Sequence, residues 1–379
     1  MQLELKDLLI SPFYFKLDNK GRKKIFSKIN TDIEKLAKKI GCSKYTLKIF
    51  QNNYRFIRYD ILKKLLILSN LNTNTIEKHV ISVKRGCSNR EVEINLPIKT
   101  SPELANLIAK GLGDGGISLD NRFFYTNQQI ELINEVISNT NKAIGKNKHT
   151  IYFKNKSKCY EMKFSSVIGF VLNFFGVPIG YKIGQKVDIP IWIKEGNKEI
   201  KKMFIRGLFD DEACVNFIKS SRSRRIIFSI SKRNKYAKSL TKFLKSLQDL
   251  LNEFKIKSNS ISIQNKSEDK IVLRFTIQNK ESLENYKKQI YFTHPKKRET
   301  LEKILKSYKD TQKIKKLILK TINESNKPLN TTKIFTLLKI NRRLLNYHLN
   351  DLYKRNKINK NYKIKPVIWY SKDLPHKIP

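Results

Sequence analysis

The chain has 379 residues, 40% of them hydrophobic, which is enough for two or three domains with packed cores and excludes a disordered polypeptide. Lysine and arginine number 78 against 33 acidic residues, so the formal net charge of +45 favours a polyanionic partner, with nucleic acid ahead of an anionic membrane. A lysine-rich composition that only keeps the protein in solution is the alternative.

Four cysteines without a CxxC pair and five histidines without a matching cluster indicate neither a disulfide framework nor a zinc site. The sequence begins without a signal-peptide pattern, and no segment approaches the ~18 consecutive apolar residues that a membrane span needs. We therefore expect a cytoplasmic protein that associates with the nucleoid and not with a membrane.

Residues 1–75 are predicted to form a helical helix-turn-helix domain. The segment NTDIEKLAKKIGCSKYTLKIFQ places apolar residues on one helical face, turns at Gly41 and then starts a second helix. An ordinary helical hairpin has the same pattern. The basic second helix favours DNA binding, with Lys44 and Lys48 as candidate contacts.

Residues 76–99 contain two short runs of alternating apolar and polar residues around Gly86. This pattern predicts a β-hairpin that connects the first domain to the next, and we assign no chemistry to it.

The central region carries one motif twice, first as LIAKGLGDGGIS and later as FIRGLFDDEACV. Each copy opens the same predicted order of elements, which is helix, two strands, helix, two strands and helix. The repeats span residues 100–190 and 191–305, joined by a linker with Pro190 and Trp192 as anchors. The expected fold class is α+β, a pseudo-twofold duplicate of αββαββα units with antiparallel, saddle-shaped sheets.

Residues 306–379 are predicted to form a winged helix, because three helical patterns precede a basic, aromatic strand pair. Leucines form the buried stripe of the third helix, which leaves Arg342, Arg343 and Asn346 available to phosphates or bases.

The duplicated motif resembles the two signature helices of the monomeric LAGLIDADG homing endonucleases. The resemblance covers about residues 100 to 300, and two such motifs at repeat spacing are far more specific than one. If the two helices cross at the pseudo-twofold, small residues such as Ala109, Gly113 and Gly207 permit close approach of the backbones. This pairing brings the acidic helix ends, Asp114 and Glu212, together.

Two carboxylates at the negative ends of two helix dipoles repel each other unless a cation is present. Mg²⁺ or Mn²⁺ prefers such oxygen ligands together with substrate phosphates, so Asp114 and Glu212 are the expected catalytic metal ligands for phosphodiester hydrolysis. The resemblance implies further ligands from the backbone carbonyls of Gly113 and Asp211. The alternative is that the two acids merely end helices, as isolated Asp-Gly pairs often do.

The resemblance also implies a polar or basic residue at the end of the second strand of each half, near the scissile phosphate. The matching positions are Asn127 or Gln128 in the first half, of which we favour Gln128, and Lys232 in the second. Lys232 would stabilise developing charge or position water, unless it is a solvated loop lysine. Ala213 replaces the usual glycine and the first half lacks the lysine, so slow cleavage or nicking is an expected consequence.

DNA recognition is expected from the two sheets, whose alternating side chains can follow the major groove. Most of the basic candidates are expected to contact phosphates and to contribute affinity without sequence choice. The candidates on the sheets are Arg122, Tyr125, Lys154, Lys163, Lys219, Arg222, Arg224 and Arg225.

We therefore expect a monomeric, site-specific endonuclease for double-stranded DNA that needs a divalent metal and no small-molecule cofactor. The chain does not begin with Cys, Ser or Thr and ends in HKIP, so a free-standing enzyme is expected rather than a splicing intein. The main alternative is a DNA-binding transcription regulator that keeps the LAGLIDADG scaffold without cleaving, and a weaker one is an RNA-splicing helper.

Overall fold

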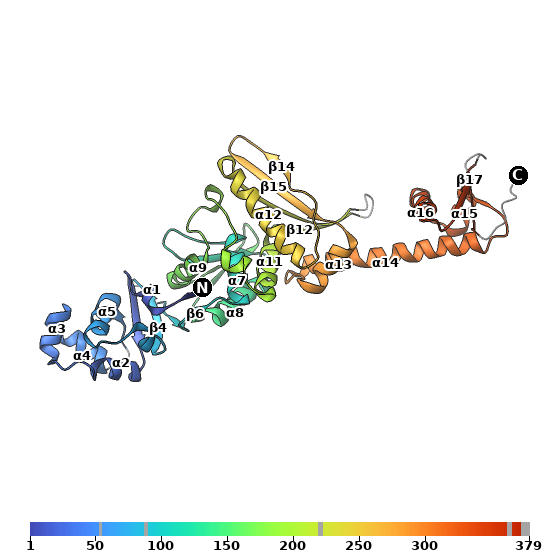
Figure 1. The fold of residues 1–379 in the computed structure, drawn as a ribbon. Coiled ribbons are helices and arrows are strands. Elements are labelled where there is room, and N and C mark those ends of the chain that lie inside the picture. The colour runs from blue at the N-terminus through green and yellow to red at the C-terminus, as the bar shows by residue number, and fades with distance from the viewer. Residues whose placement is uncertain (53–54, 87–89, 219–222, 362–365, 373–379) are drawn as a thin grey trace. The chain divides into compact units, whose positions relative to one another are not determined.

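The computed structural model describes residues 1–52, 55–86, 90–218, 223–361 and 366–372 (Figure 1). The chain divides into two compact units, Met1–Leu301 and Glu302–Pro379. Helix α14 (Pro295–Asn323) begins in the first unit and ends in the second.

The N-terminal part of the first unit contains a five-stranded sheet in the order β3-β2-β4-β5-β9. Its strands are β2 (Phe13–Leu17), β3 (Ile57–Arg58), β4 (Val80–Arg85), β5 (Val92–Ile94) and β9 (Gly145–Asn147). A separate strand pair joins β1 (Gln2–Leu3) to β6 (Ile98–Lys99). The helices are α1 (Leu5–Leu8), α2 (Asn19–Phe26), α3 (Ile33–Ile40), α4 (Lys44–Asn52), α5 (Tyr59–Leu68) and α6 (Thr73–Glu77).

This sheet corrects the expectation of a purely helical N-terminal domain. The segment FYFKL at β2 alternates buried and half-buried residues, which is the period of a strand and not of a helix. The hairpin of β4 and β5 is present as predicted, with Val83 opposite Val92. It is also part of this sheet and no mere connection, because β5 pairs with β9 of the first repeat at Glu93 and Lys146.

The helices α3 and α4 lie where the sequence predicts them. The Asp32 carboxylate accepts a hydrogen bond from the Glu34 backbone N–H at 2.8 Å and so caps the start of α3. The helix ends at Gly41, whose φ of 80° is left-handed. The Ser43 hydroxyl then accepts from the Thr46 backbone N–H at 3.0 Å and caps α4.

The two repeats have the same strand topology, which confirms the predicted duplication. The first sheet has the order β10-β11-β8-β7 and the second the order β14-β15-β13-β12, all antiparallel. The first repeat comprises α7 (Pro102–Leu112), β7 (Gly115–Ile117), β8 (Phe123–Asn127), α8 (Ile130–Ala143), β10 (Thr150–Lys154), β11 (Cys159–Lys163) and α9 (Ser166–Phe175). The second comprises α11 (Lys198–Glu212), β12 (Ala213–Ile218), β13 (Ser223–Arg233), α12 (Ala237–Glu253), β14 (Ser262–Lys266), β15 (Lys270–Ile277) and α13 (Lys280–Gln289).

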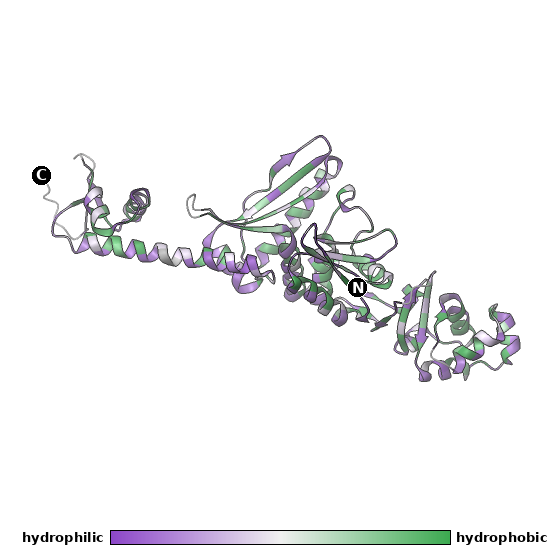
Figure 2. Cartoon of the chain, turned by 180° about the vertical axis from the view of Figure 1, so that it is seen from behind, coloured by the Kyte–Doolittle hydropathy of each residue, from purple (hydrophilic) through white to green (hydrophobic). Residues whose placement is uncertain are grey.

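The linker between the repeats contains a 3-10 turn (Lys182–Gly184) and the short helix α10 (Ile191–Lys194). Trp192 anchors it, because the buried indole N–H donates to the Phe175 carbonyl at 3.0 Å. A further 3-10 turn (Asn234–Tyr236) leads into α12, which packs on β13 and β15. Figure 2 shows that the outer strand β14, with the sequence SIQNK, is mostly hydrophilic.

The signature helices α7 and α11 pack directly against each other, and residues 104–112 of α7 are all buried. A Cβ atom placed on Gly207 would lie 2.9 Å from the Ala109 Cβ and 3.1 Å from the Asn106 carbonyl oxygen. Glycine at this position therefore sets the distance between the two helices.

We expect Gly207→Ala to destabilise the first unit by about 1–2 kcal/mol, since overpacking costs about 1–3 kcal/mol and exceeds the gain in helix propensity. Urea unfolding followed by circular dichroism measures the effect. Gly184→Ala is the matched control, because its Cβ would meet only Tyr181 at 3.5 Å. A stable Gly207→Ala protein would mean that the helices can separate freely.

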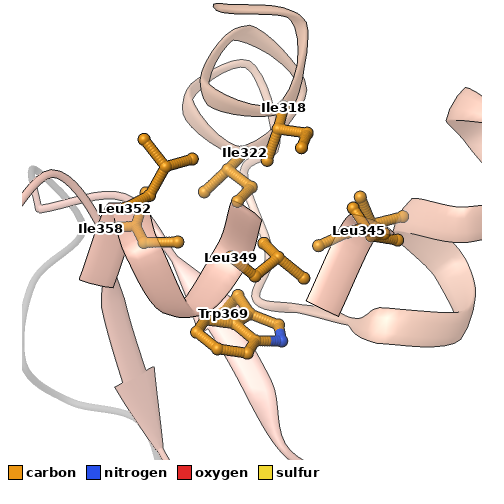
Figure 3. Packing of buried hydrophobic residues seen from close by; sticks show 8 residues of the cluster. Ile318, Ile322, Leu345, Leu349, Leu352, Ile358 and Trp369 are labelled. Atoms are coloured by element: carbon orange, nitrogen blue, oxygen red, sulfur yellow. The ribbon is translucent and has the colours of Figure 1, made fainter. Parts of the chain in front are cut away.

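The second unit has a small core of its own (Figure 3). Its elements after α14 are β16 (Leu329–Asn330), α15 (Thr331–Leu338), α16 (Arg342–Lys354), β17 (Asn359–Asn361) and β18 (Ile368–Tyr370). The strands form a sheet in the order β16-β18-β17. The core residues are Ile318, Ile322, Ile334, Leu345, Leu349, Leu352, Ile358 and Trp369. In the described part of the chain, every helix is too short or too polar to span a bilayer.

Candidate functional site

Asp114 and Glu212 are brought together at the C-terminal ends of the paired helices α7 and α11. Asp114 follows α7 and is exposed, whereas Glu212 is the last residue of α11 and is half-buried. Desolvation and then the negative charge of Asp211 raise the pKa of Asp114 to about 6. Desolvation and then the negative charge of Asp114 raise the pKa of Glu212 to about 7. Each carboxylate is therefore desolvated and close to another acid, and the charges of Lys182 and Lys297 oppose both shifts only in part.

Two lysines that the sequence analysis missed close the ends of these helices. The Lys182 ammonium donates to the carbonyls of Leu112 at 3.1 Å and of Gly113. The Lys297 ammonium donates to the carbonyls of Phe209 at 3.2 Å and of Asp211 at 3.3 Å. The Phe209 carbonyl also accepts from the Ala213 backbone N–H, whereas the last carbonyls of a helix lack intrahelical donors. A cation at each C-terminus therefore satisfies these end carbonyls and opposes the helix dipole. Burial lowers the pKa of both lysines.

Each of these lysines follows the third helix of its own repeat, α9 for Lys182 and α13 for Lys297. Their positions are therefore related by the duplication. A lysine at a similar distance after the third helix of each repeat is a signal in the sequence that could have indicated them.

The predicted Lys232 lies at the same site. Its side chain is almost fully buried, and its ammonium donates to the Lys182 carbonyl at 2.5 Å. Burial, together with the positive charge of Lys182, lowers its pKa to about 8, against the opposing charge of Glu212. A solvated loop lysine would be exposed and would keep its ordinary pKa. The alternative that Lys232 is a solvated loop residue is therefore wrong.

Of the two candidates at the end of β8, Asn127 and not Gln128 contacts the acidic pair. The Asn127 amide donates to the Asp114 carboxylate at 2.9 Å. Gln128 lies one residue beyond the end of β8 and is exposed. Of the two alternatives at this strand end, the structure places Asn127 in the site.

The Asp211 side chain crosses from the second repeat into the first. Its carboxylate accepts hydrogen bonds from the Lys110 ammonium at 2.9 Å, the Tyr125 hydroxyl at 2.6 Å and the Asp114 backbone N–H at 3.1 Å. The side chains of Lys110 and Asp211 are fully buried. Burial alone would lower the pKa of Lys110, but the charges of Asp211 and Asp210 outweigh it and the pKa is raised.

The donor set fits a hard divalent cation only in part. Two neighbouring carboxylates are suitable ligands for Mg²⁺ or Mn²⁺. The Gly113 and Asp211 carbonyls were expected to be metal ligands. They already accept hydrogen bonds from Lys182 and Lys297, so a metal ion would compete with these ammonium groups for the same oxygens. In the described part of the chain, no three His, Cys, Asp or Glu side chains form a group that could hold a metal ion by themselves. Substrate phosphate and water would have to complete the coordination.

We expect the two acids to make the metal-free protein less stable as the pH rises. Both pKa values are higher in the folded protein than in an unfolded chain, so their stabilising contribution is complete below about pH 4 and is lost by about pH 7. The shift of Glu212 alone corresponds to about 3 kcal/mol, and the exposed Asp114 adds a smaller amount after a discount for solvent screening.

Thermal unfolding in EDTA at pH 5 and pH 8 measures this effect against the Asp114→Asn/Glu212→Gln double variant. The native protein is expected to lose more stability than the variant over this range. Mg²⁺ at pH 8 is expected to stabilise only the native protein. If the stability of both proteins changed equally with pH, the two ionised acids would not be the cause of the destabilisation.

The predicted DNA contacts on the two sheets do not all lie on the outer faces, which point away from the helices. In the first sheet Phe123, Tyr125 and Met162 point to the helices and are fully buried. Tyr125 was predicted to contact DNA, but its ring is inaccessible and its hydroxyl is bonded to Asp211. Burial and then the Asp211 charge raise the pKa of Tyr125. The alternation of the strand, which places every second residue inside, accounts for the error.

The outer face of the first sheet carries Lys154 and Lys163, as the sequence predicts. Arg122 is exposed just before β8 and pairs with Asp120 at 2.9 Å. In the second sheet, Arg224 and Arg225 are neighbours on β13 and so point to opposite faces. Lys219 and Arg222 lie outside the described residues.

Arg225 shares the outer face with a residue that the sequence analysis overlooked, Arg274 of β15. In the flanking elements the candidate contacts are exposed. These are Lys44 and Lys48 on α4, and Arg342, Arg343 and Asn346 on α16.

The comparison with family models agrees with the second copy of the motif. A family model described as a LAGLIDADG-like domain matches residues 199–291, which lie in the second repeat. The replication factor C small subunit of Methanocaldococcus jannaschii is 36% identical over 88 residues, covering 23% of this chain and 5% of that protein. The tRNA-splicing ligase RtcB of Pyrococcus abyssi is 26% identical over 173 residues, covering 45% of this chain and 18% of that protein.

The chain thus spans less than a fifth of the length of these two relatives, and a shared segment of this size carries neither of their activities to this protein. Among solved structures, the homing endonuclease I-DmoI in complex with DNA and Mn is 17% identical, covering 50% of this chain and 96% of that one with a TM-score of 0.33. A TM-score this low carries no argument about the family or the function of this chain. The second repeat therefore contains a LAGLIDADG-like domain over residues 199–291, and the first repeat carries another copy of the same motif.

Proposed function

We propose that the protein is a site-specific endonuclease that hydrolyses both strands of duplex DNA with the help of a divalent metal ion. One observation carries the proposal. Two carboxylates from paired helices meet at one site, with pKa values raised to about 6 and about 7 by desolvation and by neighbouring acids. A scaffold that only binds DNA has no need of such a pair.

Asp114 and Glu212 would hold the metal, which would activate water and stabilise charge on the phosphate. The protein's own groups have separate roles. Asn127 orients the Asp114 carboxylate through its amide. Lys182 and Lys297 fix the helix ends that carry the two acids.

Lys232 is suited to a proton-transfer or charge-stabilising role at the second half of the site. With a pKa of about 8 it is mostly protonated at neutral pH, when it can stabilise a negatively charged phosphate oxygen. Its neutral fraction grows as the pH rises through 8, when it can accept a proton from water. The first half has only amide side chains at this position, so we expect unequal rates on the two strands.

DNA binding would use the net charge of +45 and the outer faces of the two sheets. We propose α3 and α4 as a helix-turn-helix, and the α14–β18 elements of the second unit as a winged helix, that add contacts outside the cleavage site. Because both repeats lie in one chain, a monomer can present the whole site.

A transcription regulator that binds DNA without cleavage is the second candidate. The exposed basic residues on α4 and α16 favour it, since two such helices outside the repeats suit a binding protein. The retention of both acids favours cleavage. An RNA-splicing role would require a preference for folded RNA over duplex DNA at equal salt concentration.

Cleavage of a randomised duplex-DNA library in Mg²⁺ or Mn²⁺ tests the proposal. We expect cuts at one family of sequences with the native protein and none with Asp114→Asn. Selective binding by both proteins without cuts under either metal would establish the regulator instead.

A further inference from the structure

The outer face of the first sheet carries a carboxylate at its centre. Glu161 lies on β11, opposite Thr126 of β8 on one side and Tyr152 of β10 on the other. Its neighbours along the strand, Tyr160 and Met162, point to the opposite face, and Met162 is fully buried against the helices. Glu161 therefore points away from the helices, on the face where Lys163 also lies.

Two lysines hold this carboxylate in place. The Lys163 ammonium lies 2.8 Å from one Glu161 oxygen, and the Lys154 ammonium bonds the other. The Glu161 side chain is 11% exposed, while those of Lys154 and Lys163 are 49% and 42% exposed. Burial alone would raise the pKa of Glu161, but the hydrogen bonds from Lys154 and Lys163 outweigh it and the pKa is lowered. The carboxylate is thus ionised at neutral pH.

A buried anion at this place opposes general affinity for DNA. It repels phosphates and neutralises two lysines that would otherwise bind them. Since the chain carries 78 basic against 33 acidic residues, an acid at the centre of the face calls for a specific benefit. Among base edges in the major groove, the exocyclic amine of cytosine is the donor that a glutamate accepts from.

The second sheet carries an arginine at its centre. Arg274 on β15 lies between Ser229 of β13 and Ser262 of β14. The adjacent Phe275 is fully buried and stacks on Phe228 at 5.4 Å, so Arg274 points to the outer face. Its cross-strand neighbours are short and uncharged, which leaves the guanidinium room to approach a base. Guanine, with two acceptors in the major groove, is the preferred partner of arginine.

We propose that Glu161 and Arg274 determine the base sequence at the centre of the two half-sites, with Glu161 selecting a cytosine and Arg274 a guanine. The inference rests on the proposed DNA-binding function and names the bases that the site takes. Lys154 and Lys163 hold the Glu161 carboxylate on the outer face of the sheet, and either exposed lysine can move to an adjacent base or phosphate.

Selection from a randomised duplex library by binding, without metal and at fixed salt concentration, tests the inference. The proteins are the native chain, Glu161→Gln and Arg274→Gln. We expect each variant to lose its preferred C·G pair at one position only, by about 5- to 100-fold, and to favour adenine there because glutamine pairs with adenine. Preferences at all other positions are expected to persist.

Lys270→Gln at the exposed start of β15 is the control, with weaker binding to all sequences and unchanged preferences. If Glu161→Gln only tightens binding to every sequence and steepens the salt dependence, Glu161 merely restrains lysines and the inference is overturned. If the native chain enriches a sequence and both variants enrich the same one, the inference alone fails. If the native chain enriches no sequence, the proposed specific function fails with it.

Discussion

Replacing Glu212 with glutamine is expected to lower the rate of DNA cleavage about a thousandfold, which is about 4 kcal/mol of transition-state stabilisation. Glutamine keeps the shape of the side chain but removes the charge that a divalent cation needs. The same change removes the carboxylate whose pKa is raised to about 7, so the metal-free fold is not expected to lose stability. Single-turnover cleavage of a selected duplex, with binding measured separately, gives the rate and the affinity.

Glu199→Gln is the matched control, because Glu199 lies in the first turn of the same helix and pairs with Lys202 at 3.0 Å. It is expected to leave both rate and affinity within about twofold, as surface substitutions usually do. A Glu212→Gln protein that cleaves at the native rate would remove Glu212 from the reaction. Loss of DNA binding along with cleavage would instead mean that the charge supports the fold.

The sequence predicts the repeat, its strand order and the pair of acids because these depend on local periodicity and on a motif that occurs twice. The strand FYFKL at β2 also has a period of two residues, but it is short and lies among longer helical patterns, which favour a helical prediction for the N-terminal region. The pairing of β5 with β9 joins residues about fifty positions apart and has no local signal.

The remaining site residues depend on contacts between distant segments. Lys182 and Lys297 look like any other surface lysine in a chain with 78 basic residues, and only the packing of the linker and of α14 brings them to the helix ends. Lys110 is a charged residue inside the apolar run LIAKGL, and this pattern indicates a buried charge that needs a partner. Its partner Asp211 comes from the other repeat, so the pair exists only when the repeats dock.

Asp211→Asn is expected to destabilise the first unit by about 3 kcal/mol, because removal of one member of a buried ion pair leaves the other charge uncompensated. The Lys110 ammonium would keep only Glu135 at 3.9 Å and the more distant Asp210. Tyr125 and the Asp114 N–H would also lose a charged acceptor. Urea unfolding measures the loss, and Glu253→Gln, which breaks the exposed pair with Lys201, should cost less than about 1 kcal/mol.

The Asp211→Leu/Lys110→Met double variant separates the ion pair from simple packing. If the buried charge causes the instability, removing both charges should recover most of the loss, since apolar residues of similar volume replace such pairs well. A double variant as unstable as Asp211→Asn would contradict this cause. Asp211 is also the largest source of the negative charge that raises the pKa of Asp114, so that pKa should fall in Asp211→Asn. The acidic limb of the cleavage profile should then move to lower pH, which a purely structural role of Asp211 would not produce.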